Sequence, residues 1–169
     1  MDGKDLNSTV QGNPYRRLDD RASARAALRE ELSTARQELR LFERDTDYWD
    51  LDGAEFCAAL EAFLRAHRLG RVTLVLHDIS ALEKRAVRLP ALAARFAPRV
   101  QLRQTDSEVH SYSTGVAIVD RSAVLRHPHF DRGFAYLDRD EAAIAAAEHL
   151  FDQLIENSHA APPLHVTGL

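Results

Sequence analysis

The stretch VTLVL at residues 72–76 decides the fold class, because it is short, almost wholly apolar and rich in β-branched residues. Such a run is typical of a strand that is covered on both faces of a sheet. An amphipathic helix is expected to follow Asp52, which has capping-box spacing to Glu55, and to end near Gly70. Further upstream, partial alternation over residues 38–43 predicts another strand. The order strand, helix, strand indicates a right-handed parallel crossover.

The same pattern continues on both sides of this unit. A first helix is expected to begin near Asp20, and a last amphipathic helix to bury Ile144, Ala147, Phe151 and Leu154. Further strands are expected at residues 100–103, 115–120, 123–126 and 134–137, with the middle two forming a hairpin. The sequence therefore predicts an α/β fold with a mixed, mostly parallel sheet and helices on both faces. We expect a flexible arm over residues 1–18, the domain over residues 19–157 and a flexible tail over residues 158–169.

Composition limits the classes of function. The 169 residues carry a formal charge of −4, so binding of nucleic acid through a basic face is not expected. No apolar run approaches the ~20 residues that span a bilayer, and the polar N-terminus does not resemble a signal peptide, so we expect a cytoplasmic protein without membrane contact. Cys57, the single cysteine, excludes an internal disulfide and a thiol-rich metal site. Its position between apolar residues favours a buried structural role over a nucleophile.

Polar residues follow two of the expected strands. Asp45 and Asp47 come after the first strand, and His77 and Asp78 come after the second. Ligands in open α/β sheets bind beyond the carboxyl ends of strands, so these side chains are candidates for acid–base or metal-binding work. The alternative is that the aspartates cap helices and turns.

Other motifs give weaker signals. His127 and His129 flank a proline and are weak candidates for zinc or copper ligands, because no third ligand is obvious and the pattern favours an ordinary solvent-facing turn. The chain has no GxGxxG, GxxxxGK[ST] or GxSxG motif, so no nucleotide-type cofactor is expected.

Residues 110–124, HSYSTGVAIVDRSAV, resemble the hairpin that carries the HxKxxxxD motif of the phospholipase D superfamily. In that family the histidine is the nucleophile, the lysine holds phosphate oxygens and the aspartate supports the histidine. Asp120 stands at the aspartate position, and it is a candidate site residue for that reason. Ser113 and Gly115 stand at the histidine and lysine positions, and neither can do that chemistry. The resemblance therefore implies that the motif is degenerate and phospholipase D chemistry is lost.

Residues 20–155 are also similar to a proteobacterial, phospholipase D-like domain of unknown function that is sometimes fused to GNAT-type acetyltransferases. This resemblance implies a noncatalytic binding or regulatory module of phospholipase D-like fold. Active enzymes of the superfamily unite two such halves, so a homodimer is expected. Two alternatives remain: a hydrolase or phosphotransferase with a relocated Asp/His site, and an accessory domain for an acetyltransferase partner.

Overall fold

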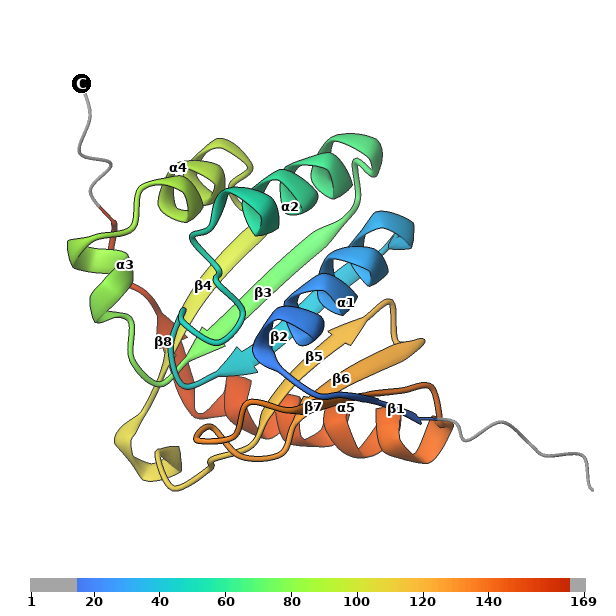
Figure 1. Cartoon of the computed structure of the whole chain (residues 1–169). Coiled ribbons are helices and arrows are strands. Elements are labelled where there is room, and N and C mark those ends of the chain that lie inside the picture. Colours follow the sequence, from blue (N-terminus) through green and yellow to red (C-terminus); the bar gives the residue numbers. More distant parts are fainter. Residues whose placement is uncertain (1–14, 165–169) are drawn as a thin grey trace, which may run out of the picture.

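A single sheet of eight strands forms the centre of the domain in the computed structural model, which describes residues 15–164 (Figure 1). The strand order is β1-β7-β6-β5-β2-β3-β4-β8. The elements are, in chain order, β1 (Tyr15–Leu18), α1 (Arg21–Thr34), β2 (Glu38–Glu43), α2 (Ala54–Ala66), β3 (Arg71–Leu76), α3 (Ser80–Lys84), α4 (Arg88–Arg95), β4 (Val100–Thr105), a 3₁₀ turn η1 (Ser107–Val109), β5 (Gly115–Val119), β6 (Ala123–His127), β7 (Ala135–Asp138), α5 (Glu141–Glu156) and β8 (Ser158–Ala160).

The mixed α/β fold that the sequence predicts is confirmed, but most of the strand pairings are antiparallel. Parallel pairing is confined to β2, β3 and β4, which are joined through helices. All other neighbours pair antiparallel. For β5, β6 and β7 the physical reason lies in the short connections between them, which can join only antiparallel strands.

Helices cover both faces of the sheet and enclose two separate apolar cores. On one face, α1, α2 and α4 pack over alternate residues such as Leu39, Leu41 and Leu74. On the other face, α5 packs over the intervening residues, which include Phe42 and Val75. None of the helices within residues 15–164 is long and apolar enough to cross a membrane.

Two short strands lie where the sequence predicted an arm and a tail. β1 pairs with β7 at one edge of the sheet, and β8 pairs with β4 at the other. Both segments are too short to show periodicity. They form strands because they hydrogen-bond to backbone groups of β7 and β4 that would otherwise be unpaired. Residues 1–14 of the predicted arm and residues 165–169 of the predicted tail lie outside the described residues.

Aspartates at helix starts have mixed outcomes. The first helix begins next to Asp20, as predicted, and the Asp20 carboxylate caps it by accepting from the amide of Ser23 at 2.7 Å. The predicted capping box at Asp52 is wrong, because α2 begins one residue later with Gly53 as its N-cap. The Asp52 carboxylate instead accepts from the amides of Val87 and Leu89, at 3.2 and 2.7 Å. It therefore secures the start of α4, a contact that sequence spacing does not reveal.

Candidate functional site

Four buried polar side chains lie at one edge of the sheet. Glu43 ends β2, His77 follows β3, Thr105 ends β4 and His127 ends β6. The parallel strands have their carboxyl ends on this side of the sheet, which is where α/β proteins bind ligands. Because burying a polar group is costly unless it is hydrogen-bonded, each of these side chains needs a partner.

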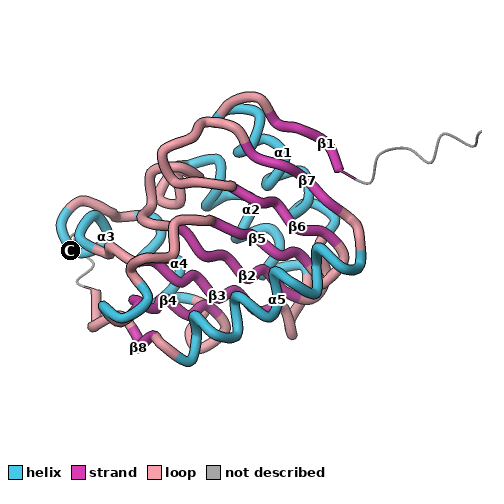
Figure 2. Tube along the Cα trace, turned by 90° about the horizontal axis from the view of Figure 1, so that it is seen from below, coloured by secondary structure: helices cyan, strands magenta, loops and turns pink. Residues whose placement is uncertain are grey.

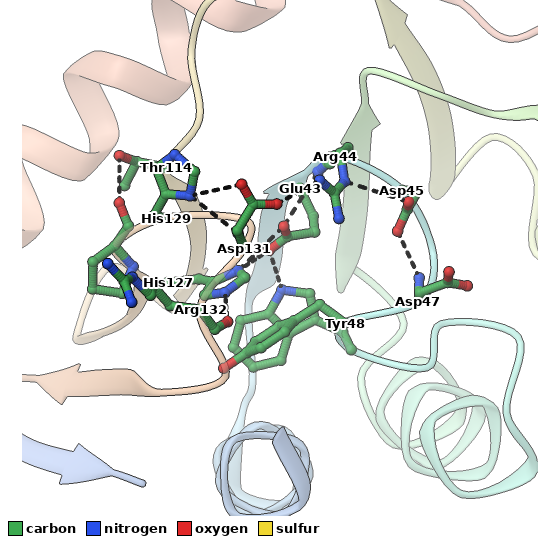
Figure 3. A network of polar contacts seen from close by, with 12 residues as sticks. Glu43, Arg44, Asp45, Asp47, Tyr48, Thr114, His127, His129, Asp131 and Arg132 are labelled. Atoms are coloured by element: carbon green, nitrogen blue, oxygen red, sulfur yellow. Dashed lines mark hydrogen bonds and ion pairs between the residues drawn. The ribbon is translucent and has the colours of Figure 1, made fainter. Parts of the chain in front are cut away.

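Glu43 and His127 form a buried pair on the α1 side of the sheet (Figure 3). Their exposed fractions are 1% and 0%. The Glu43 carboxylate lies 3.0 Å from Nδ1 of His127 and accepts from Nε1 of Trp49 at 3.1 Å. Nε2 of His127 lies 2.6 Å from the carbonyl oxygen of Arg132, and the ring of Tyr48 stacks on the imidazole with centroids 3.6 Å apart. Both ring nitrogens are therefore engaged inside the protein.

Gly115 explains how the pair forms across an intervening strand. β5 lies between β2 and β6, and Gly115 is the register partner of His127. A β-carbon at position 115 would lie 2.2 Å from Oε2 of Glu43 and 3.2 Å from the β-carbon of His127. The missing side chain leaves the space in which the glutamate reaches the histidine. The carboxylate of Glu43, which comes from β2, therefore occupies the space beside Gly115.

His77 belongs to a second polar group, on the α5 side of the sheet. Its Nε2 donates to the carbonyl oxygen of Tyr112 at 2.8 Å, so Nδ1 of a neutral ring accepts from the hydroxyl of Thr105 at 2.6 Å. The edge of the ring packs against Phe42, and His110 lies beside it with centroids 4.7 Å apart. Burial lowers the pKa of His77; the Tyr112 carbonyl opposes this effect, and His110 adds to it.

Asp120 lies at the far end of β5, away from Gly115. Its backbone has a positive φ of 54° in the hairpin turn. Its carboxylate accepts from three consecutive amides at the start of β2, those of Arg36, Gln37 and Glu38, at 2.8, 2.8 and 2.9 Å. Asp120 therefore ties the hairpin turn to the entry of β2.

We expect Asp120→Ala to lower the free energy of unfolding by about 2 kcal/mol, since three amides lose their acceptor. Asp120→Asn is the matched control, because asparagine keeps one acceptor oxygen and tolerates the left-handed conformation. Urea denaturation measures both. Equal losses in the two variants would contradict the assigned role of the carboxylate.

The four strand-end candidates do not all meet at one point. Oδ1 of Asp45 accepts from the amide of Asp47 at 3.0 Å, so these two residues share a turn. The carboxylate of Asp78 accepts from the amide of Ser80, at the start of α3, at 2.8 Å. Hydrogen bonding to Ser80 lowers the pKa of Asp78. The ring of His77 faces Thr105 and Tyr112 instead. The structure thus brings Asp45 and Asp47 together and directs Asp78 and His77 elsewhere.

The structure places His127 and His129 in different surroundings. His127 is buried with both nitrogens engaged, whereas His129 is exposed beside Asp131. Within residues 15–164, no cluster of three histidine, cysteine or acidic side chains is arranged to hold a metal ion. Cys57 is a buried residue of α2, and its thiol lies 3.3 Å from the carbonyl oxygen of Leu51. Burial raises the pKa of the thiol to about 12, so the thiol stays protonated.

Sequence reasoning missed Glu43 and Trp49. One signal for Glu43 was available, because a charged residue that directly follows Leu41 and Phe42 at the end of a buried strand requires a buried partner. Nothing in the sequence indicated which histidine that partner is.

The lowered pKa of His77 predicts a dependence of stability on pH. The unfolded chain takes up a proton at His77 near pH 6.5 and the folded chain does so only at lower pH, so the free energy of unfolding falls as the pH drops below about 6.5. In urea melts at about pH 7.5 and 5.5, His77→Gln should show a smaller difference than the parent. His149→Gln, a change of an exposed histidine on α5, should keep the parent's difference. Identical pH dependence in the parent and His77→Gln would contradict the prediction.

Comparison with solved structures places the domain among phospholipase D-like folds. TrmBL2, an archaeal chromatin protein, matches with a TM-score of 0.64 and 14% identity over 90% of this chain and 56% of that chain, so this chain spans only about half of it. Nuc, a phospholipase D family member from Salmonella typhimurium, matches with a TM-score of 0.61 and 14% identity over 87% and 97% of the two chains. NucT from Helicobacter pylori matches with a TM-score of 0.57 and 12% identity over 87% and 99%. At these identities the likeness concerns the fold alone.

Comparison by sequence gives the family. No curated protein matches the chain. Residues 20–166 match the family model described as "Domain of unknown function (DUF7931)". Since this match covers most of the chain and the fold is similar to that of Nuc, the protein belongs to the DUF7931 family and has a phospholipase D-like fold.

Proposed function

We propose that this domain is a noncatalytic phospholipase D-like module that works by binding, or by regulating a partner, and not by cleaving phosphodiesters. The observation that carries the proposal is the contact at Gly115, where the carboxylate of Glu43 fills the place of a phosphate-binding lysine.

The chemistry at the hairpin supports this proposal. A phospholipase D-type site needs a cation to hold the phosphate oxygens and an imidazole to attack phosphorus, as the family resemblance implies. Gly115 supplies no cation, and a carboxylate in its place repels an incoming phosphate. The nearest imidazole, that of His127, is fully buried against Glu43 and Arg132, so it has no access to a substrate.

The other two motif positions support the same conclusion. Ser113 carries no imidazole, and its carbonyl oxygen is used in a hydrogen bond from the amide of Phe130 at 2.9 Å. The carboxylate of Asp120, at the opposite end of β5, accepts hydrogen bonds from three backbone amides. Each residue at a motif position therefore has a structural role, which fits a fold retained after its chemistry was lost.

The structural neighbours are compatible with a binding role. TrmBL2, whose fold is similar, is described as a chromatin protein with a novel mode of DNA binding. That description concerns TrmBL2 only. It supports the proposal in one respect, which is that this fold serves binding proteins as well as enzymes.

A homodimer is part of the proposal. The chain spans nearly the whole of Nuc, and one phospholipase D-like half is expected to pair with a second copy. Sedimentation equilibrium tests this directly, with twice the mass of one chain as the expected result. A monomer that persists at high protein concentration would reject the dimer and leave the noncatalytic assignment intact.

A phosphodiesterase assay tests the noncatalytic assignment. With bis(p-nitrophenyl) phosphate and with a single-stranded oligonucleotide as substrates, the full chain should give no turnover above buffer. The alternative, a hydrolase with a relocated site, predicts turnover that falls in His77→Gln, Asp45→Asn, Asp47→Asn or Asp78→Asn. Turnover that copurifies with the protein and responds to any of these variants would overturn the proposal.

A further inference from the structure

One part of the sheet face lies beyond the reach of α5. Seen from the α5 side, the helix runs over the middle of the sheet and leaves β1 and β7 uncovered (Figure 2). The contacts agree, since α5 packs on β2, β4, β5, β6 and β8. Four side chains of this area, together with Arg126 on the adjacent strand β6, form what we call the aromatic–arginine surface: Tyr15, Arg17, Arg126, Phe134 and Tyr136.

Strand register places these side chains together. Tyr136 on β7 is the partner of Arg17 on β1 and of Arg126 on β6, so an arginine, a tyrosine and an arginine form one row across three strands. Side chains that are directly opposite in antiparallel strands point to the same face. The neighbouring positions Leu125 and Leu137 belong to the core under α1, so the row points away from that core.

The rings and guanidinium groups contact one another without closing the surface. The guanidinium of Arg17 lies 4.3 Å from the centre of the Phe134 ring, and that of Arg126 lies 5.4 Å from the centre of Tyr136. Tyr136 meets Tyr15 and Phe134 edge to face, at centroid distances of 5.6 and 5.8 Å, so no ring is stacked on another. Tyr15 is 45% exposed, and both arginines are exposed.

The aromatic–arginine surface lies outside both apolar cores. None of its side chains belongs to either apolar cluster of the described residues. Arg126 is the only exposed position in β6, whose other residues are buried. A long cationic side chain on an interior strand, set over a half-buried tyrosine, fits a surface that receives a ligand.

We infer that the aromatic–arginine surface binds single-stranded nucleic acid. Exposed aromatic rings on a sheet face stack with unpaired bases, and neighbouring arginines stack with bases or pair with phosphates. The chemistry is tolerant of sequence, because every base offers a π-face. This inference deepens the proposed binding function and rests on it, but it involves a surface remote from Gly115.

Charge favours a single strand on this surface over duplex DNA and over a second copy of the chain. Duplex DNA binds through many phosphate contacts, and a chain with a net charge of −4 and two arginines on this surface offers few. A second copy of the chain would bring the same arginines against each other across a two-fold axis, which like charges oppose. A single strand needs few cations, because stacking supplies most of the affinity.

Fluorescence anisotropy with a labelled oligothymidylate and the full chain tests the inference. Binding in the micromolar range is expected, with a slope of log affinity against log salt of about −1.4 if both arginines neutralise a phosphate. Tyr136→Ala should weaken binding about fivefold or more, and Tyr136→Phe should retain it, since either ring stacks. Arg126→Glu should weaken binding and flatten the salt slope. Arg68→Glu makes the same charge change on the exposed turn after α2 and should leave affinity unchanged.

Each other outcome rejects the inference. Tighter binding to a duplex of the same sequence would show that stacking is not the mode of recognition. Self-association that depends on Tyr136 and Arg126 would assign the surface to the dimer instead, and binding to phosphatidylserine vesicles without oligonucleotide binding would assign it to a lipid. Equal affinity in Arg68→Glu, Arg126→Glu and the parent would place binding elsewhere. Because the phosphodiesterase assay does not involve this surface, a chain that neither cleaves nor binds the oligonucleotide would reject only this inference.

Discussion

Glu43→Ala is expected to lower the free energy of unfolding by about 3–5 kcal/mol, because it leaves buried polar groups without a partner and removes buried side-chain volume. The alanine leaves Nδ1 of His127 and Nε1 of Trp49 without acceptors in a region that water does not reach. It also opens a cavity beside Gly115. Urea or guanidinium denaturation followed by tryptophan fluorescence measures the loss, and Trp49, the only tryptophan, reports on this site directly.

Glu43→Gln is the matched control. Glutamine keeps the volume and one acceptor oxygen, so it should cost clearly less than alanine. Glu55→Ala, on the exposed first turn of α2, should have almost no effect. If alanine and glutamine were equally harmful, the charge on Glu43 would matter more than its hydrogen bonds with His127 and Trp49. If neither were harmful, the buried pair would not be a structural centre of the domain.

Gly115→Ala is expected to cost about 3 kcal/mol, at the upper end for overpacking a core. The new methyl group would lie 2.2 Å from the carboxylate of Glu43. The end of a glutamate side chain moves cheaply when it is free, but here His127 and Trp49 hold it. The added carbon therefore displaces the carboxylate from its partners.

Gly133→Ala is the matched control, because nothing lies within 4 Å of a β-carbon at that position. A double-mutant cycle gives the sharper test. In a Glu43→Ala background, Gly115→Ala should cost much less than it does in the parent, because the clashing carboxylate is gone. Additive losses would contradict the proposed competition for the space at Gly115, and with it the main argument for a noncatalytic hairpin.

Local patterns were enough to predict most of the elements of the fold. The apolar runs at residues 72–76 and 115–119 appear as buried strands, and Asp20 caps the first helix. These signals work because strand burial, helix capping and tight turns depend on residues a few positions apart. The edge strands β1 and β8 were not predictable in this way, since their order comes from partners far away in the chain.

The candidate site was predictable only in part. The sequence pointed to His77 and to the carboxyl ends of the strands, and it identified Gly115 as a departure from the phospholipase D pattern. It gave no means to pair Glu43 with His127, which are 84 positions apart, or to assign Asp120 to amides that are 82–84 positions away. Such pairs depend on which strands become neighbours, and that choice is made by the whole sheet.

Alternation and capping, read from the sequence by itself, determined that the chain forms an α/β domain. The resemblance to the phospholipase D hairpin implied that a lysine and a histidine are missing from the motif positions. Only the tertiary structure decided what fills the lysine position, and which side chains line up across β1, β7 and β6. The physical reason is that burial and periodicity are local properties of the chain. The contacts of Glu43 with His127, and of Arg17 with Tyr136, exist only once strands that are distant in sequence are set side by side in register.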